Sequence, residues 1–450
     1  MVKIFPFRGI HYNEDKIQRL EKVIAPPYDV ISPEMQESLY KQSDYNIIRL
    51  ILGKEFAEDT EFNNRYIRAS QYFEGLLRHN ILVKEEKPCI YIYEEEFTFK
   101  GKKLKRLGFV ALLRLEHLAK SKVFPHEETL SRPKQDRLEI LKKCKANLES
   151  IFGLFSDEKG RIIKFLKKFT RCKPFLQVKD LDRYTHRIWK IDKKPAIKKI
   201  MQDMKDRWVF IADGHHRYEA SLRYRDEMQE KNQRIAEDEP YNYIMMYFSP
   251  LEDKNLLLLP IHRLVKKENF DPVKFEEDLK AFFDITVFEF SRRNEKKGQK
   301  KFIKTIEKEG LGNHVFGMYM GGNKYYMLKL KDEKMIEKFI EENKPRVWKR
   351  LDVSILHSIV LGHMLNLKKG TPEYEKNIAF EKIDEARIFE AVKEGDYQVA
   401  FILNPPKVED VVAIASKYER MPQKSTFFYP KLISGLVLYQ MDQNEKIVFE

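Results

Sequence analysis

The chain has 450 residues, which allows two or three domains with a substantial buried core. Its formal net charge is +14, but charged residues of both signs make up 34% of the sequence. Most of the positive charge is therefore expected on ordinary solvated surface, and basicity alone is weak evidence for a nucleic-acid partner.

The cysteines and the apolar segments help to predict the cellular location of the protein. Cys89, Cys144 and Cys172 are widely spaced, which argues against a disulfide framework or a zinc site. The start, MVKIFPFRGIHYNEDK, lacks an apolar signal core, and the sequence contains no run of about 18 apolar residues. These features predict a soluble cytoplasmic protein without a membrane partner.

Strands and helices alternate in the first part of the chain. CIYIYEEEFTF (89–99) and LKRLGFVALLRL (104–115), joined by KGKK, predict an antiparallel hairpin. The polar, proline-containing stretch 121–137 is expected to be a loop that leads into a helix over 138–155, where the apolar positions have helical spacing. A short apolar run at 208–212 then predicts a strand, and 216–230, without proline or glycine, predicts a helix.

A second region begins near Asp271, where Asp followed by Pro is typical of a helix start. FGMYM and YYMLKL flank GGNK and predict a second hairpin. Residues 378–421 alternate between strand-like and helix-like segments in the manner of βαβα units, and the charged stretch 291–301 is expected to be a surface connection. The sequence thus predicts a mixed α/β (α+β) protein with domains at 1–265 and 266–450.

IADGHHRYEAS (211–221) concentrates titratable side chains at the predicted strand-to-helix turn. Such a turn exposes unpaired N–H groups at the positive end of the helix dipole, and Gly214 allows close backbone approach. Each neighbour alone has an ordinary interpretation, with Asp213 as a cap, the histidines as packed side chains and Arg217 in an ion pair. Together, Asp213, His215, His216 and Arg217 predict a polyphosphate site.

Several stretches resemble known families. APPYDVIS (25–32), PHEETLSRPKQDR (125–137), ADGHHRYEAS (212–221), LPIHRLV (259–265) and MPQKSTFFYPKL (421–432) are similar to a prokaryotic family called domain of unknown function 1015, across nearly the whole chain. DGHHRYEA also resembles the phosphate-binding turn of the ParB/sulfiredoxin superfamily. Within that superfamily, DGHHR and the upstream PHE are closest to free serine kinases, which phosphorylate L-serine with ADP or ATP.

The kinase resemblance implies roles for individual residues. Glu127 would be the general base that takes the proton of the acceptor hydroxyl, and His126 would help to position phosphate or substrate. Asp213 would orient the acceptor or Mg²⁺. Gly214, His215, His216 and Arg217 would hold the phosphates, with ATP or ADP as the nucleotide. Phosphoryl transfer depends mainly on positioning and electrostatic stabilisation, with a carboxylate to receive the proton, and these residue types fit that chemistry.

Differences from the related families argue against some of their activities for this chain. His215 stands where sulfiredoxins carry a reactive cysteine, which argues against sulfinic acid repair. The sequence shows neither a clear counterpart of the DNA-reading region of the chromosome-partitioning relatives nor a common Gly-rich phosphate loop. Nucleic acid is therefore a disfavoured partner, and no metal ligands can be assigned from the sequence.

Three further stretches have two interpretations each. Tyr28 and Asp29 form part of a rigid turn or line the site. Arg132, Lys134 and Arg137 belong to a solvated charged loop or contact the same anion as the Glu127 segment. The lysines of QKSTFFYPK, Lys424 and Lys431, lie in a surface loop or in a clamp that closes over the substrate.

Two functions remain open. The first is a nucleotide-dependent phosphotransferase for a small hydroxyl compound, with free L-serine as one candidate acceptor and Mg²⁺ on the phosphates. The second is a nucleotide-binding regulator without turnover, which would account for the size of the C-terminal region. The sequence does not decide the acceptor, the choice between ATP and ADP, or the oligomeric state.

Overall fold

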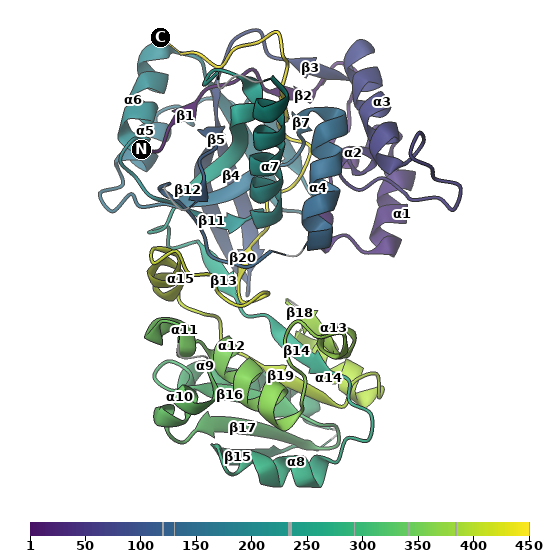
Figure 1. Cartoon of the computed structure of the whole chain (residues 1–450), viewed down its shortest axis with the longest axis vertical. Coiled ribbons are helices and arrows are strands. Elements are labelled where there is room, and N and C mark those ends of the chain that lie inside the picture. The colour runs from purple at the N-terminus through teal and green to yellow at the C-terminus, as the bar shows by residue number, and fades with distance from the viewer. Residues whose placement is uncertain are drawn as a thin grey trace. The chain divides into compact units, whose positions relative to one another are not determined.

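The computed structural model describes residues 1–118, 121–129, 131–232, 236–291, 293–340, 343–382 and 385–449. The chain forms two compact units, and Figure 1 shows helices and sheets in both. The first unit comprises Met1–Pro125, Thr129–Leu257 and Pro430–Glu450, and the second comprises His126–Glu128 and Leu258–Tyr429. The mixed α/β class expected from the sequence is confirmed. Whereas the sequence assigned residues 430–450 to the second domain, their contacts lie in the first unit.

The first unit is built on a nine-stranded mixed sheet with the order β6-β11-β8-β12-β5-β4-β10-β9, and β1 pairs with β5. The strands of this unit are β1 Ile4–Phe5, β2 Ile10–Tyr12, β3 Leu82–Lys84, β4 Ile90–Phe99, β5 Lys102–Arg114, β6 Val123–Pro125, β7 Ala146–Asn147, β8 Ile151–Phe155, β9 Leu176–Lys179, β10 Thr185–Ile191, β11 Val209–Asp213, β12 Tyr243–Pro250 and β21 Tyr439–Gln440. The helices are α1 Pro33–Gln42, α2 Ile48–Ile51, α3 Arg65–Arg78, α4 Ser131–Cys144, α5 Arg161–Leu166, α6 Lys194–Met204 and α7 His215–Asn232, with 3-10 turns at Leu20–Lys22, Tyr28–Val30 and Pro240–Asn242.

Helices cover the sheet of the first unit. Helix α6 buries Ile197, Ile200 and Met204 in the apolar core that it shares with the sheet. Helix α7 packs against α4, and α4 packs against α3, so that these helices lie side by side in Figure 1. Because α7 also contacts β8, its first residues are fixed against the sheet.

The sequence predicted parts of this unit correctly. β4 and β5 form the expected antiparallel hairpin, and β11 leads into α7 as expected. The helix expected over 138–155 is wrong in its second half, where α4 ends at Cys144 and Ile151–Phe155 forms the buried strand β8. Lys145 has a positive φ of 48°, which ends the helix, and a short, fully buried apolar run has no periodicity that separates strand from helix.

The charged stretch before that helix also differs from expectation. Residues 131–137 form the first two turns of α4 and are not a loop. Pro133 is compatible with this because it lies in the first turn, where its missing N–H costs no helical hydrogen bond. Upstream, Val123–Pro125 is strand β6, which pairs in parallel with β11.

The second unit contains a six-stranded sheet with the order β15-β17-β16-β19-β14-β18. Its strands are β13 Leu257–Leu259, β14 His262–Val265, β15 Phe283–Glu289, β16 Val315–Tyr319, β17 Lys324–Leu330, β18 Ile378–Glu381, β19 Val399–Ile402 and β20 Phe427–Tyr429. Its helical segments are α8 Pro272–Leu279, α9 Glu295–Glu309, the 3-10 turn Glu333–Met335, α10 Ile336–Phe339, α11 Arg346–Lys349, α12 Asp352–Ile355, the π-helix Leu356–Met364, α13 Pro372–Asn377, α14 Glu385–Lys393 and α15 Val408–Ala415.

The expectations for the second unit are confirmed in most elements. Asp271 caps α8 through bonds from Val273 N and Lys274 N, and β16 and β17 form the expected hairpin. The strand and helix order over 378–421 is also confirmed, but β18 and β19 both pair antiparallel with β14, which lies between them. The surface connection expected over 291–301 is wrong for its described C-terminal part, because helix α9 begins at Glu295.

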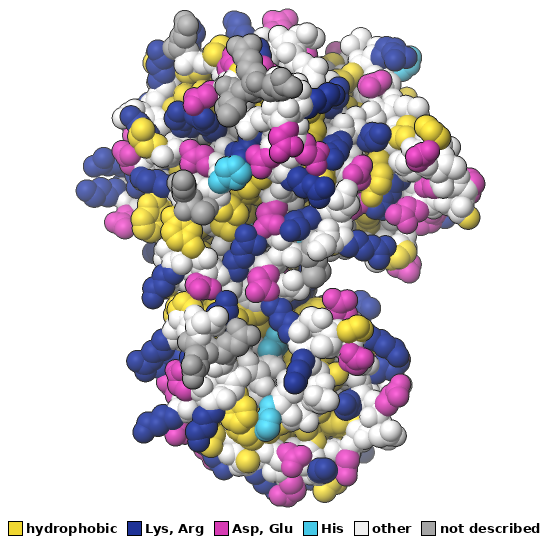
Figure 2. Space-filling model, in the orientation of Figure 1, with side chains coloured by type: hydrophobic (Ala, Val, Ile, Leu, Met, Phe, Trp, Pro, Cys, Tyr) yellow, Lys and Arg dark blue, Asp and Glu magenta, His cyan; other side chains and the backbone are white. Residues whose placement is uncertain are grey.

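None of the helices formed by the described residues is long and apolar enough to cross a bilayer. On the face drawn in Figure 2, basic and acidic side chains are interspersed. This distribution agrees with the mixed charge composition of the sequence.

Candidate functional site

The turn between β11 and α7 is the centre of the candidate site in the first unit. Strand β11 carries a bulge between Ile211 and Asp213, and such irregularities re-aim the side chains that follow them. Gly214 has φ +93°, a conformation that favours glycine. A Cβ on Gly214 would lie 3.0 Å from Nη2 of Arg217, so the absence of a side chain lets that guanidinium fold back over the turn.

Four charged side chains from three separate stretches of the sequence meet at this turn. The Lys431 ammonium donates to Oδ1 of Asp213 at 2.6 Å and also to the carboxylate of Asp29. Nη2 of Arg217 donates to Oδ2 of Asp213 at 2.9 Å. The motifs 25–32, 212–221 and 421–432 therefore each contribute a charged side chain to one cluster.

The charges in this cluster depend on one another. The side chain of Lys431 is only 11% exposed, and this burial alone would lower the pKa of its ammonium. The carboxylates of Asp213 and Asp29 outweigh that effect and raise the pKa above its ordinary value. Likewise, burial opposes the charge of Arg217, but Glu149 and Asp213 raise the pKa of its guanidinium. Both cations are therefore charged at neutral pH.

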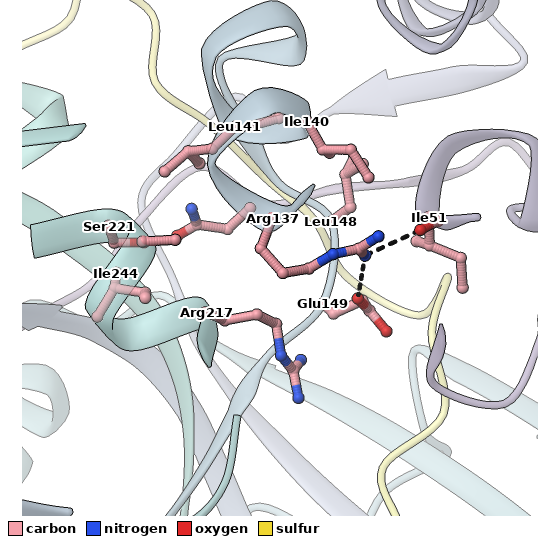
Figure 3. Close-up of a pocket in the computed structure, with 12 residues that line it drawn as sticks. Ile51, Arg137, Ile140, Leu141, Leu148, Glu149, Arg217, Ser221 and Ile244 are labelled. Carbon is pink, nitrogen blue, oxygen red and sulfur yellow. Dashed lines mark hydrogen bonds and ion pairs between the residues drawn. The ribbon is translucent and has the colours of Figure 1, made fainter. Parts of the chain in front are cut away.

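Behind the turn lies a small cavity of about 40 Å³, lined in part by Arg137, Glu149, Arg217 and Ser221. Figure 3 shows the Arg137 guanidinium turned toward Ile51 and Glu149, with the Arg217 guanidinium pointing away from it. Since a water needs about 10–15 Å³ of such space, the cavity has room for a few waters and not for a nucleotide. Any nucleotide at this turn must bind on its solvent side.

Glu149 connects the segments that carry the charged cluster. Its Oε1 accepts from the backbone N–H of Tyr28 at 3.2 Å and from the Ser434 hydroxyl at 3.0 Å. Its Oε2 lies 3.6 Å from Nη1 of Arg137, which also stacks over the ring of Tyr28 at 3.8 Å. Glu149 is thus a buried anchor beside Asp29 and Lys431, and nothing in its sequence context marked it out.

The other basic residues predicted for the phosphates lie on α4. Lys134 forms an ion pair with Glu219 of α7 at 3.2 Å, and Arg137 is buried between Asp136, Ile51 O and Glu149. Arg132 is exposed and makes no ion pair among the described residues. At the turn itself, His215 is buried and His216 is half-buried in the first turn of α7.

The predicted base, Glu127, belongs to the second unit together with His126. Oε1 of Glu127 accepts from the backbone N–H of Lys424 at 2.8 Å, and the Thr426 hydroxyl lies 2.7 Å from Nε2 of the buried His126. Lys424 has φ +55°, so Glu127 holds a loop residue in an unfavourable backbone conformation. In the described contacts within its unit, Glu127 is a loop anchor.

Arg263, from the motif 259–265, completes this arrangement. Its side chain is 0% exposed and donates to the carbonyl of Lys424 at 2.9 Å, to Ile261 O at 2.6 Å and to Nε2 of His357 at 3.1 Å. Burial lowers the pKa of Arg263 to about 10, and burial together with Arg263 lowers that of His357 well below its usual value. The Lys424 loop is therefore held at its N–H by the half-buried Glu127 and at its carbonyl by the fully buried Arg263.

The first cluster offers groups suited to a metal–nucleotide complex. The side chains of Asp29 and Asp213 are 26% and 24% exposed, so solvent reaches both carboxylates. Mg²⁺ is commonly held by one or two carboxylates together with water and substrate phosphates, and this pair fits that donor set. A dedicated cage of three or more His, Cys, Asp or Glu side chains is absent from the described part of the chain.

Residues 4–354 match the family described as "Protein of unknown function (DUF1015)". The chain belongs to this family. A search of curated proteins finds no match. The five stretches that resembled this family from the sequence include members of both polar clusters described above.

Solved structures share a weak similarity with this DUF1015 chain. A conserved hypothetical protein from Pyrococcus furiosus is 15% identical, with a TM-score of 0.33, over 74% of this chain and 97% of that chain. A mutant free serine kinase in complex with ADP is 13% identical, with a TM-score of 0.32, over 76% and 92%. SbnI with C-terminal truncation from Staphylococcus aureus is 10% identical, with a TM-score of 0.32, over 73% and 86%. These TM-scores are too low to support a functional argument.

Proposed function

We propose that the chain is a nucleotide-dependent phosphotransferase that acts on a small hydroxyl compound, with free L-serine as the first acceptor to test. The observation that carries the proposal is the convergence of Asp29, Asp213, Arg217 and Lys431 at a strand–glycine–helix turn. Helix N-termini of this kind bind phosphate groups through backbone N–H groups and the helix dipole. The resemblance of DGHHR and PHE to free serine kinases supplies the reaction class.

In the proposed reaction, the residues of the turn hold and orient the polyphosphate of ATP or ADP. Arg217, Lys431 and the first turn of α7 offset charge on the phosphates, while Asp29 and Asp213 would hold a Mg²⁺ ion, which would supply further positive charge to stabilise the phosphates. The acceptor hydroxyl forms the new O–P bond, the bond to the departing nucleotide breaks, and the Glu127 carboxylate takes the hydroxyl proton. The proposal requires this carboxylate to reach an acceptor bound at the turn.

Two adjacent strands of the first unit lead to the PHE and DGHHR stretches. β6 and β11 are adjacent parallel strands, with Pro125 opposite Ile211. Because they are parallel, both strands end at the same edge of the sheet. The PHE stretch leaves the sheet from one of them and DGHHR leaves it from the other, which supports a shared role for the two stretches.

One observation favours the alternative, a nucleotide-binding regulator without turnover. Glu127 Oε1 accepts the Lys424 N–H, a role that requires no proton transfer. Incubation of the full chain with ATP or ADP, Mg²⁺ and a panel of hydroxy amino acids tests the choice. A phosphorylated acceptor supports the phosphotransferase, and tight nucleotide binding without product supports the regulator.

Glu127→Gln is the decisive variant, because the Gln carbonyl oxygen can still accept the Lys424 N–H but cannot take a proton. If Glu127 is the base, single-turnover transfer should fall by about 10²- to 10⁴-fold while nucleotide affinity and melting temperature stay the same. Glu127→Ala, which also removes the acceptor, serves as the comparison for loop anchoring. A transfer rate that survives in the Gln variant would remove Glu127 from the mechanism and make Asp213 the next candidate base.

A further inference from the structure

The second unit contains its own pocket, with a volume of about 640 Å³. Its walls come from the loop after α9, from α11 with the start of α12, and from the segment between β19 and α15. Ile261, Arg263 and Ser425 also line it. This volume lies in the range of about 300–1,000 Å³ that small-molecule sites occupy.

Side chains tie the pocket walls together. Nδ2 of Asn404 donates to Ile306 O and Val315 O, both at 3.3 Å, and joins the segment after β19 to the loop after α9. A Cβ on Gly310 would lie 2.0 Å from Nδ2 of Asn404, so a glycine is required at this approach. Nδ1 of His314 lies 2.7 Å from Oδ1 of Asp352 and joins the same loop to α12. The pocket is therefore preformed, which limits the ordering cost of binding.

Some charged side chains of the pocket have partners within it. Arg350 is paired with Glu333 at 2.8 Å, and the ring of His314 lies beside the carboxylate of Asp352. Arg346, on α11, and Lys407, at the start of α15, are exposed side chains that line the pocket and make no ion pair within the described residues. Asp410 is half-buried, and it is the one carboxylate of the pocket that has no ion-pair partner among the described residues.

A further positive charge lies deeper in the pocket wall. Arg263 is fully buried, and its described hydrogen bonds go to two carbonyls and a histidine ring. The Glu127 carboxylate offsets part of this charge. With Arg350 and Glu333 paired, Arg263, Arg346 and Lys407 outnumber Asp352 and Asp410, and the pocket has a positive excess that an anion would neutralise.

The start of α15 adds backbone donors at the same place. Lys407 is the N-cap of this eight-residue helix and provides no side-chain cap. The N–H groups of Val408 and Glu409 have no backbone acceptor among the described residues. Because α11 packs against α15, Arg346 and Lys407 approach the pocket from neighbouring elements, while Val347 and Leu351 provide apolar surface beside them.

We propose that this pocket is a second ligand site, which binds a small phosphate monoester with an apolar remainder. Arg346, Lys407 and the first turn of α15 hold the phosphate group, and the apolar remainder lies against Val347 and Leu351. The site lies within the second unit and does not depend on phosphotransfer at the turn of α7. It gives the second unit a binding role of its own.

Calorimetric titration of the full chain with phenyl phosphate and with inorganic phosphate tests this site. The variant Arg346→Ala/Lys407→Ala should bind phenyl phosphate at least about tenfold more weakly, and added salt should weaken binding to the native chain. Lys338→Ala/Lys417→Ala removes two exposed lysines of the same unit from outside the pocket lining and is the matched control. The binding that Arg346→Ala/Lys407→Ala removes should persist in Arg217→Ala, a variant that tests whether phenyl phosphate binds at the turn of α7 in the first unit instead.

Five outcomes would overturn the proposal. The native chain does not bind phenyl phosphate, or the pocket variant binds it as well as the native chain does. The control variant loses as much affinity as the pocket variant, which would assign the effect to general charge. Arg217→Ala abolishes binding, which would assign it to the turn of α7. Phenyl phosphate binds no better than inorganic phosphate, which would rule out the monoester with an apolar remainder. Melting curves of each variant separate lost binding from lost folding.

Discussion

Each unit contains one polar cluster built from several family motifs, but the two clusters differ in what they hold. Around Asp213, carboxylates and cations pair with one another, and Asp29 and Asp213 remain about a quarter exposed. Around Lys424, the half-buried Glu127 and the fully buried Arg263 hold main-chain groups of a loop. Because solvent reaches Asp29 and Asp213, these carboxylates can exchange an ion-pair partner for a ligand. The cluster around Lys424 instead fixes the backbone conformation of a loop. The difference separates a charged cluster that solvent reaches from a cluster that holds a loop.

Removal of the central cation should show the largest effect. In Lys431→Met, Asp29 and Asp213 lose the ammonium between them, and we expect about 2–3 kcal/mol of lost stability together with loss of nucleotide binding. Lys446→Met, which breaks the more exposed pair with Glu239, is the matched control and should cost at most about 1 kcal/mol. Urea unfolding measures both. If the double variant Lys431→Met/Asp29→Asn regains stability, the loss in Lys431→Met comes from the unpaired carboxylates. Equal losses of stability in Lys431→Met and Lys446→Met would contradict this explanation.

The second unit should lose stability in acid, because it contains the buried histidine His262. Burial and the neighbouring Arg263 lower the pKa of His262 to about 3, and its Nδ1 accepts the N–H of Leu403. Between pH 6.5 and 3 the unfolded chain therefore binds a proton that the folded chain does not, so stability falls as the pH falls through this range. At pH 5 this loss is about 2 kcal/mol relative to pH 7.5. Urea unfolding of the native chain and of His262→Gln at both pH values measures the part of this loss that His262 causes. If both chains lose the same stability between the two pH values, His262 is not its cause.

A smaller effect is expected at the turn when charge is kept but geometry is changed. Arg217→Lys retains the positive charge, but its single nitrogen replaces the two guanidinium nitrogens that donate separately to Ser150 O and to Asp213. Nucleotide affinity should fall by about tenfold, since charge-assisted hydrogen bonds contribute roughly 1.5–3 kcal/mol and part of this is retained. Calorimetry with ATP and Mg²⁺ measures the change. Unchanged affinity would count against a polyphosphate at this turn.

The smallest effect on the chemistry should come from the cysteines. Burial raises the pKa of Cys89 and of Cys144 to about 12, so neither is a thiolate at neutral pH. Cys172 is exposed, and all three are free. Replacement of the three with Ala or Ser should preserve nucleotide binding and transfer, even with some loss of stability. An inactive but folded triple variant would reveal a thiol role.

Elements with strong local signals could be predicted from the sequence. The two hairpins, the cap at Asp271 and the strand-to-helix turn at Gly214 follow from alternation, turn residues and capping preferences, which act over a few residues. Strand β8 could not be separated from a helix, because all five of its residues are buried and none alternates with solvent. Its pairing with β11 and β12 is a tertiary effect.

The charged cluster was only partly predictable. Asp213 and Arg217 belong to one local motif, and their mutual bond spans four residues. Lys431 and Asp29 are separated from that motif by long stretches, and their pairing depends on the return of residues 430–450 to the first unit. Glu149 carried no sequence signal, because a single glutamate in a mixed segment does not reveal that it will be buried.

The return of the segment from Pro430 to the first unit has a consequence for synthesis. The ribosome makes the whole second unit before it makes Lys431 and the strand β21 that pairs with β7. At about 5–20 residues per second, the first unit waits on the order of ten seconds for these last parts. During that interval the carboxylates of Asp29 and Asp213 have no ammonium between them, so the charged cluster at the turn is incomplete. A nascent or truncated chain that stops before residue 431 therefore cannot assemble the cluster, which couples its assembly to synthesis of this late segment.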